Sequence, residues 1–314
     1  MESIETAEAS LDLTQGVHPW RERLVRSAAF LCAAITVLTT GGIIAVLLVN
    51  AAEFFAEWSV WDFLTGTKWS PAIQPVEYGV LPLVWGTMVI TLGSALIALP
   101  LGVAAAVYLS EYARPKVRAV VKPYLEILAG VPTVVYGYFA LVYVTPALKT
   151  VFPTISTFNT LSASIVVGIM IIPFVASISE DAIRAVPKSL RMAGYGLGAS
   201  KFSVVIRVVI PAAFSGIIAS FILALSRAIG ETMAVTIAAG QTPRLASIFN
   251  LEETFLRPAE TMTAAMVNIG MSDVTGDSLA YRSLFAIGLV LFFMTFAMNI
   301  LGSWVTSRFR EKYE

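Results

Sequence analysis

Residues Leu81–Leu109 read LPLVWGTMVITLGSALIALPLGVAAAVYL, and no charged side chain occurs in this segment. The hydrocarbon core of a bilayer is about 30 Å thick, and a helix of about 20 apolar residues crosses it. Because lipid offers no hydrogen-bond partners, a spanning segment must satisfy its own backbone, and a helix does so. The segment therefore predicts a transmembrane helix.

Five further segments share this length and apolar character: Ser27–Ala52, Pro123–Leu148, Leu161–Ile183, Pro211–Gly240 and Tyr281–Ser307. Of the 314 residues, 57% are hydrophobic and only 13% are charged, against roughly 25% charged in a typical soluble domain. We expect an all-α, polytopic membrane protein with six transmembrane helices. These form one domain over residues 27–307, between an N-terminal tail (1–26) and a C-terminal tail (308–314).

The distribution of basic residues predicts the orientation. Of the 21 Lys and Arg, 15 lie in the two tails and in the second and fourth connections, five lie on the opposite side in or at the edge of the other connections, and Arg227 lies within the fifth segment. The positive-inside rule then places both termini in the cytoplasm. The formal net charge is zero, which argues against the basic field of a nucleic-acid-binding protein.

Sequence signatures of enzymes are missing. No lysine follows a glycine, so a phosphate-binding loop ending in Gly-Lys does not occur. One histidine, His18, and one cysteine, Cys32, are too few for a metal cluster or an intrachain disulfide. We expect no enzyme activity, cofactor or metal in this chain, and we expect its energy source to lie on another chain.

Arg227 and Glu231 are a basic and an acidic residue deep inside a predicted span, with Ser226 and Thr232 beside them. Each charge costs about 2.5–3.5 kcal/mol at a helix centre. Their spacing of four predicts one shared helix face and an ion pair. The pair either joins helices structurally or faces a polar pathway. In the second case Arg227 meets an anion in transit, and Glu231 keeps that contact weak enough for release.

The fourth connection, Arg184–Ile210, is too long for a simple turn and mixes five basic residues with apolar positions. This pattern predicts short cytoplasmic helices whose apolar face needs a protein partner. A basic interfacial helix held by anionic lipid is the alternative.

Two motifs, one in this fourth connection and one in the fifth predicted span, resemble the membrane subunits of ATP-binding-cassette importers (MetI-like permeases). The cytoplasmic signature of that family reads Glu-Ala-Ala, three residues, Gly, nine residues, Ile-x-Leu-Pro. Here Ala193, Gly198 and Pro211 match it, and Met192 replaces the glutamate. The resemblance implies that the loop containing Met192, Ala193, Gly194, Tyr195, Gly198 and Pro211 couples the permease to an ATPase.

The run Arg227-Ala-Ile-Gly-Glu-Thr-Met-Ala-Val235 resembles the permeases of phosphate importers, as do the runs beginning at Gly79 and at Glu126. The Met-Ala-Val continuation favours one permease of such importers over its sister. The resemblance implies a multi-pass protein of the bacterial inner membrane that works with four kinds of partner: a second permease (PstA-like), an ABC ATPase dimer (PstB-like) carrying ATP and Mg, a periplasmic or surface phosphate-binding protein (PstS-like) and the lipid bilayer.

Other functions remain open at this point. A permease for another oxyanion (sulfate, molybdate or phosphonate) would carry the same arginine. A passive anion channel would use the Arg227–Glu231 pair as a gate, and a membrane scaffold in phosphate signalling would carry no flux.

Overall fold

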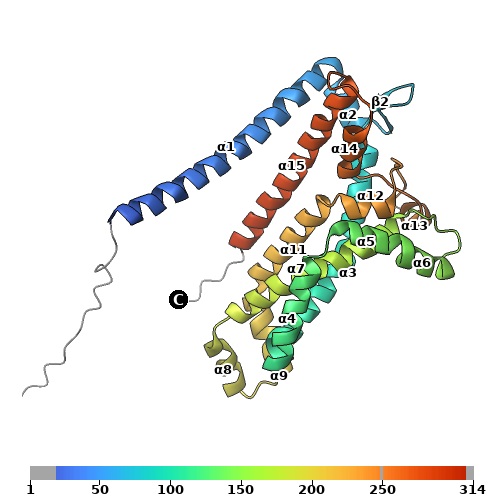
Figure 1. Cartoon of the computed structure of the whole chain (residues 1–314). Coiled ribbons are helices and arrows are strands. Elements are labelled where there is room, and N and C mark those ends of the chain that lie inside the picture. The colour runs from blue at the N-terminus through green and yellow to red at the C-terminus, as the bar shows by residue number, and fades with distance from the viewer. Residues whose placement is uncertain (1–18, 248–249, 309–314) are drawn as a thin grey trace, which may run out of the picture. The chain divides into compact units, whose positions relative to one another are not determined.

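The computed structural model describes residues 19–247 and 250–308. They form helices joined by short links and one small hairpin (Figure 1). The chain order is α1 (Pro19–Glu57), α2 (Val60–Thr65), β1 (Trp69–Ser70), β2 (Glu77–Tyr78), α3 (Leu81–Val107), the π-helical turn η1 (Tyr108–Tyr112), α4 (Pro115–Ala129), α5 (Thr133–Phe139), η2 (Ala140–Val144), α6 (Thr145–Val151), α7 (Thr160–Ala185), α8 (Lys188–Gly196), α9 (Lys201–Val204), η3 (Val205–Val209), α10 (Ile210–Ala212), α11 (Phe214–Ile229), α12 (Met233–Ala239), α13 (Leu251–Phe255), α14 (Met262–Met271) and α15 (Leu279–Arg308).

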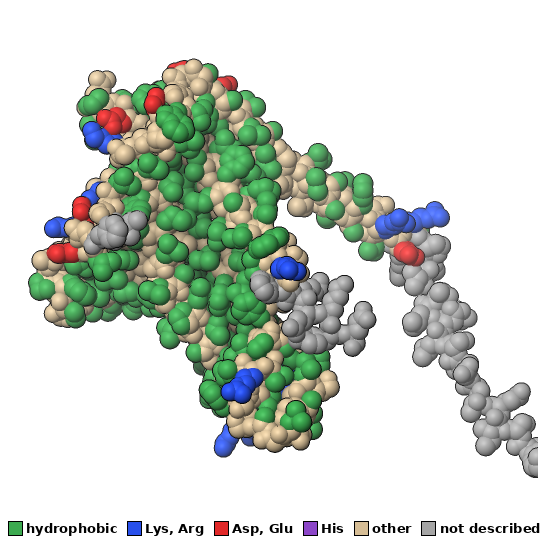
Figure 2. Space-filling view, turned by 180° about the vertical axis from the view of Figure 1, so that it is seen from behind, with side chains coloured by type: hydrophobic (Ala, Val, Ile, Leu, Met, Phe, Trp, Pro, Cys, Tyr) green, Lys and Arg blue, Asp and Glu red, His purple; other side chains and the backbone are tan. Residues whose placement is uncertain are grey.

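The chain divides into two units, Met1–Val49 and Asn50–Glu314. In the first unit the described residues belong to α1. The second unit contains the end of α1 and all the other elements. Hydrophobic side chains cover most of its face in Figure 2, with Lys and Arg at the end formed by α8 and α9.

Within residues 19–247 and 250–308, five stretches of helix are long and apolar enough to cross a membrane: Glu22–Glu57, Leu81–Tyr112, Thr133–Val151, Thr160–Ala185 and Leu279–Arg308. A sixth forms if Lys201–Ala212 and Phe214–Ile229, bent by 66° at their junction, count as one span. The all-α, polytopic fold predicted from the sequence is confirmed. Six spans and two cytoplasmic termini remain predictions.

The third predicted span was placed wrongly. Pro123–Leu148 is not one helix, because α4 ends at Ala129 and a new helical stretch begins at Thr133. Pro132 explains the break, since a proline disfavours helical backbone in the residue before it. The apolar stretch that can span is therefore Thr133–Val151, and α4 is a separate helix packed against α7.

The fifth predicted span, Pro211–Gly240, was also wrong as a single helix. The chain bends after Ala212, and α11 ends at Ile229 before α12 begins at Met233. Because of the second break, Arg227 lies in the last turn of α11, whereas Glu231 lies in the link before α12.

The core of the second unit is the packing of α3 on α7. Gly102 of α3 lies so close to Val175 that an added Cβ would come within 2.7 Å of its Cβ, and Gly93 approaches Ser164 in the same way. Small residues let helix backbones come this close, which increases van der Waals contact where lipid supplies no hydrophobic drive. The α3–α7 pair is the frame on which α11 and α4 pack.

Candidate functional site

The break between α11 and α12 is built by Gly230, Glu231 and Thr232. Gly230 follows the last residue of α11, and its N–H donates to the carbonyl of Ser226 at 3.3 Å. The Glu231 carboxylate accepts the backbone N–H of Ala234 at 3.2 Å. It thus satisfies one of the donors left free where α12 begins. The sequence ends one helix and starts the next within three residues.

Glu231 is buried and tied to α14. The hydroxyl of Thr263 donates to the Glu231 carbonyl at 2.8 Å and lies 3.1 Å from the hydroxyl of Thr261. Thr232 turns its own hydroxyl to the Gly230 carbonyl at 3.2 Å. The break is therefore held both by its own residues and by α14.

Arg227 has a different environment. It is exposed on the last turn of α11, with its guanidinium carbon 6.0 Å from the ring centroid of Phe174 on α7. Its neighbour Ser226 donates to the Asn299 side-chain oxygen of α15 at 3.3 Å. Ser226 thus orients α11 against α15 and leaves Arg227 outside the core.

The predicted Arg227–Glu231 ion pair does not form among the described residues. The prediction assumed one continuous helix, and the break at Gly230 removes the i, i+4 relation on which it depended. The carboxylate binds a backbone N–H of α12 instead. Arg227 therefore keeps a positive charge that no acidic side chain of the described chain contacts.

The predicted coupling loop, Arg184–Ile210, forms the short helices expected from its sequence. Met192 and Tyr195 are exposed on α8, as are Leu197 and Phe202 beyond it. Gly194 faces Val204 of α9, where an added Cβ would lie 3.0 Å from a valine methyl. The chain turns at Gly198 with φ +77°, and the N–H of Ala199 closes the helix end on the Gly194 carbonyl at 3.2 Å.

Pro211 lies in α10, directly before the 66° bend that leads into α11. With Ala193 exposed on α8, the matched signature residues lie on one continuous path from α8 to the base of α11. The geometry connects the exposed loop to the helix that carries Arg227.

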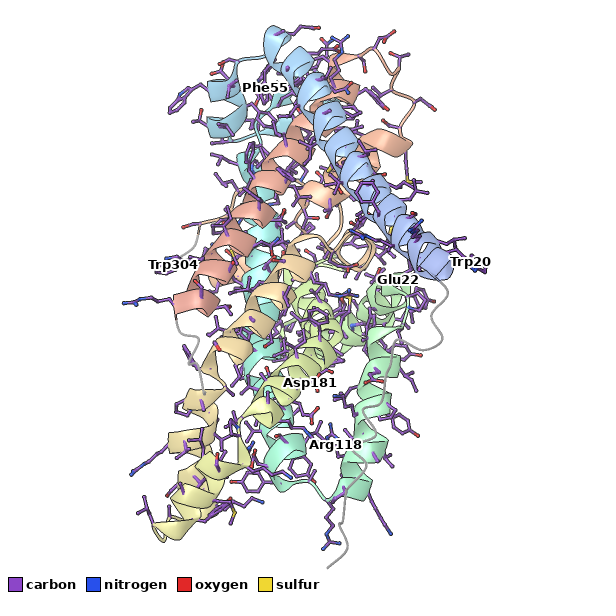
Figure 3. The ribbon with its side chains drawn as sticks, turned by 90° about the vertical axis from the view of Figure 1, so that its left-hand side faces the viewer. Trp20, Glu22, Phe55, Arg118, Asp181 and Trp304 are labelled. Atoms are coloured by element: carbon purple, nitrogen blue, oxygen red, sulfur yellow. The ribbon has the colours of Figure 1, made fainter. Side chains whose placement is uncertain are left out.

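Sequence reasoning missed a charged cluster beside this loop. Glu180 of α7 is 1% exposed and accepts Arg118 at 2.7 Å and Lys122 at 2.9 Å, both from α4. Lys122 also reaches Asp181 at 2.7 Å. Figure 3 shows Arg118 and Asp181 in the space between α4 and α7. The partners lie about 60 positions apart in the chain, so no local spacing signals them.

A second pair and a lone acid were also missed. Arg191 of α8 binds Glu111 of η1 at 2.8 Å. Glu260, between α13 and α14, is 4% exposed and accepts the Asn268 amide at 2.5 Å. Burial raises the pKa of Glu260 to about 7. The only signal for these two sites in the sequence is the acidic residues themselves, Glu111 and Glu260.

The apolar spans, the broken α11–α12 helix and the exposed loop are those of a polytopic membrane protein. The chain belongs to the family of binding-protein-dependent transport system inner membrane components, whose family model matches residues 98–311. It is 34% identical to the probable ABC transporter permease protein YqgH of Bacillus subtilis, over 92% of this chain and 91% of that protein. It is 29% identical to the phosphate transport system permease protein PstC of Mesorhizobium japonicum, over 98% and 96% respectively.

The fold is also that of a solved transporter. A chain of the bacterial alginate ABC transporter, in complex with its alginate pentasaccharide-bound periplasmic protein, matches with a TM-score of 0.64 at 12% identity. The match covers 94% of this chain and 99% of that one. The predicted ABC importer permease bundle and the inner-membrane location are confirmed.

Proposed function

We propose that this chain is a permease subunit of an ATP-driven importer of inorganic phosphate. It forms the translocation pathway with a second, PstA-like permease. A PstB-like ATPase dimer supplies ATP hydrolysis and Mg, and a PstS-like protein delivers phosphate. The PstC relative supports phosphate as the substrate, and the resemblance of the Arg227–Val235 run points the same way.

The observation that carries the proposal is Arg227. It is exposed, it lies within the apolar helix α11, and it has no ion pair in the described chain. A guanidinium that faced lipid at this depth would cost several kcal/mol. It therefore faces a polar pathway, where it offers a passing anion one uncompensated positive charge. The alternative, a purely structural role in joining helices, required an ion pair between Arg227 and Glu231, and this pair does not form in the described chain.

The motion of the ATPases reaches Arg227 along the segment of chain from α8 to α11. Closure of the ATPases moves the segment Arg184–Ile210, and the bend after Ala212 passes that motion to α11 and Arg227. Outside, the binding protein docks on the connections Trp58–Tyr78 and Gln241–Ala280. Ser226 and Thr232 keep the two ends of the helix break in place during this motion.

The test is reconstitution of the chain with its candidate second permease and ATPase in vesicles, with the binding protein added outside. Uptake of labelled phosphate that needs ATP and resists competition by sulfate, molybdate and phosphonate supports the proposal. Preferential competition by one of those anions identifies a permease for that anion instead. Flux that persists without the ATPase identifies a passive channel, and the absence of flux with all partners present identifies a scaffold.

A further inference from the structure

A charged pocket lies at the end of the bundle formed by α8, away from Arg227. It has a volume of about 470 Å³ and opens between η1, the start of α4, the end of α7 and α8. Four cationic side chains line it: Arg118, Arg184, Lys188 and Arg191. Glu111 is the one acidic side chain among the lining residues of this pocket.

Two of these cations are neutralised by carboxylates. Arg118 contacts the buried Glu180 at 2.7 Å. Arg191 contacts Glu111 at 2.8 Å and also donates to the backbone carbonyls of Ile183 and Val186. These bonds fix the wall of the pocket, because one guanidinium is held by a buried carboxylate and the other by a carboxylate and two backbone carbonyls.

The other two cations are left available. Arg184 is half exposed and lies 3.7 Å from a Glu180 carboxylate that Arg118 and Lys122 already bind more closely. Lys188 is exposed and makes no ion pair with any residue of the described ranges. The four cations face two carboxylates, so about two positive charges remain for a ligand.

We propose that this pocket binds a phosphate group, with Arg184 and Lys188 as its charged contacts. A phosphate carries one to two negative charges near neutral pH, which matches the surplus, and its oxygens accept charge-assisted hydrogen bonds from both side chains. The ligand is either inorganic phosphate or the headgroup of an anionic phospholipid, since basic pockets at the cytoplasmic side of spans bind such headgroups. A bound phosphate joins α7 to the coupling helix α8 across the link Val186–Pro187.

The test uses the full chain with Arg227→Gln, so that the pathway arginine contributes nothing to the signal. In this background we compare Arg184→Gln/Lys188→Gln with a control, Lys116→Gln/Arg308→Gln, which removes two exposed cations outside the pocket. One arm titrates inorganic phosphate into protein in phosphatidylcholine nanodiscs and measures binding and thermal unfolding. The other arm replaces part of the phosphatidylcholine with phosphatidylglycerol and omits free phosphate.

We expect saturable stabilisation in at least one arm, unchanged in the control and weakened about tenfold or more in the pocket variant, because that variant loses both charged contacts of the phosphate group. An effect in the first arm identifies free phosphate, and an effect in the second identifies a lipid headgroup. If the pocket variant and the control behave alike in both arms, the proposal is wrong. Because Arg227 is absent throughout, the result does not depend on the transport function proposed above.

Discussion

Arg227 and the cluster around Glu180 show two ways of placing charge in an apolar protein. In the cluster, Glu180 is buried under two cations from α4, at 2.7 and 2.9 Å. On α11, the arginine is exposed and the acid four residues later is buried elsewhere. The first arrangement satisfies its charges inside the chain, and the second leaves one unsatisfied.

The difference separates structural from functional charge. Removing water from a charge is costly, and an internal partner compensates most of that cost. A charge kept without such a partner must be compensated by something outside the chain. For Arg227 the proposed compensation is the transported anion. The predictions below test this contrast, beginning with the largest expected effect.

Arg227→Gln is expected to lower phosphate uptake by about 10–100-fold, because a hydrogen bond to a charged group is worth about 1.5–3 kcal/mol. Unfolding in detergent should stay unchanged, since the side chain has no internal ion pair to lose. Uptake by reconstituted vesicles measures the effect, with Arg308→Gln as the charge-matched control. Normal uptake by the Arg227 variant would remove this residue from the mechanism.

Glu180→Gln is expected to lower the free energy of unfolding, which Arg227→Gln should leave unchanged. Loss of this carboxylate removes the buried acceptor of Arg118 and Lys122, which is expected to cost about 1.5–3 kcal/mol of stability, because both cations keep contact with solvent and Lys122 keeps Asp181. Asp181→Asn, with a side chain that is 63% exposed, should cost no more than about 1 kcal/mol. Denaturant unfolding of the two variants in the same detergent measures the difference. Equal losses would show that burial does not distinguish the two acids.

Glu260 adds a third case, a buried acid that no cation of the described chain pairs with. Its pKa is raised from 4.5 to about 7 by burial, so the folded chain binds a proton more tightly than the unfolded chain. Stability from this group is therefore complete below about pH 4.5 and is lost as the pH rises from there through 7, by about 3 kcal/mol. Glu260→Gln should show a much flatter stability profile between pH 5 and 8. A profile as steep as that of the unmodified chain would contradict the assignment.

The smallest effect is expected in the coupling loop. Gly198→Ala forces an alanine into backbone with φ +77°, at a cost of about 1–2 kcal/mol. This strain should distort the end of α8 and reduce co-purification of the ATPase. Gly196→Ala is the matched control, because no atom lies within 4 Å of its added Cβ and its φ is negative. Undiminished co-purification with Gly198→Ala would argue against docking at this loop.

Part of the fold could be read from the sequence with little error. Predicted spans such as Leu81–Leu109 and Leu161–Ile183 lie within α3–η1 and α7, because their apolar length alone decides the outcome. The third and fifth predicted spans failed at Pro132 and Gly230. A hydropathy profile does not detect such breaks in a helix. The backbone conformation at a break also depends on contacts with neighbouring helices such as α14.

The candidate site was located by sequence and rearranged by packing. The sequence showed that Arg227 and Glu231 are charged residues within an apolar segment. It did not show whether they pair, because a carboxylate accepts hydrogen bonds from the donors that the fold brings near. Here that donor is the Ala234 N–H.

The sequence by itself determined that this chain is a bundle of membrane helices, because an apolar run of about 20 residues or more in lipid satisfies its backbone hydrogen bonds as a helix. Only the tertiary structure decided which charges are neutralised. Glu180 meets Arg118 across 62 positions of the chain, and Arg227 meets no acid in the described chain. Ionic contacts depend on distances in space, and packing, rather than spacing along the sequence, sets those distances.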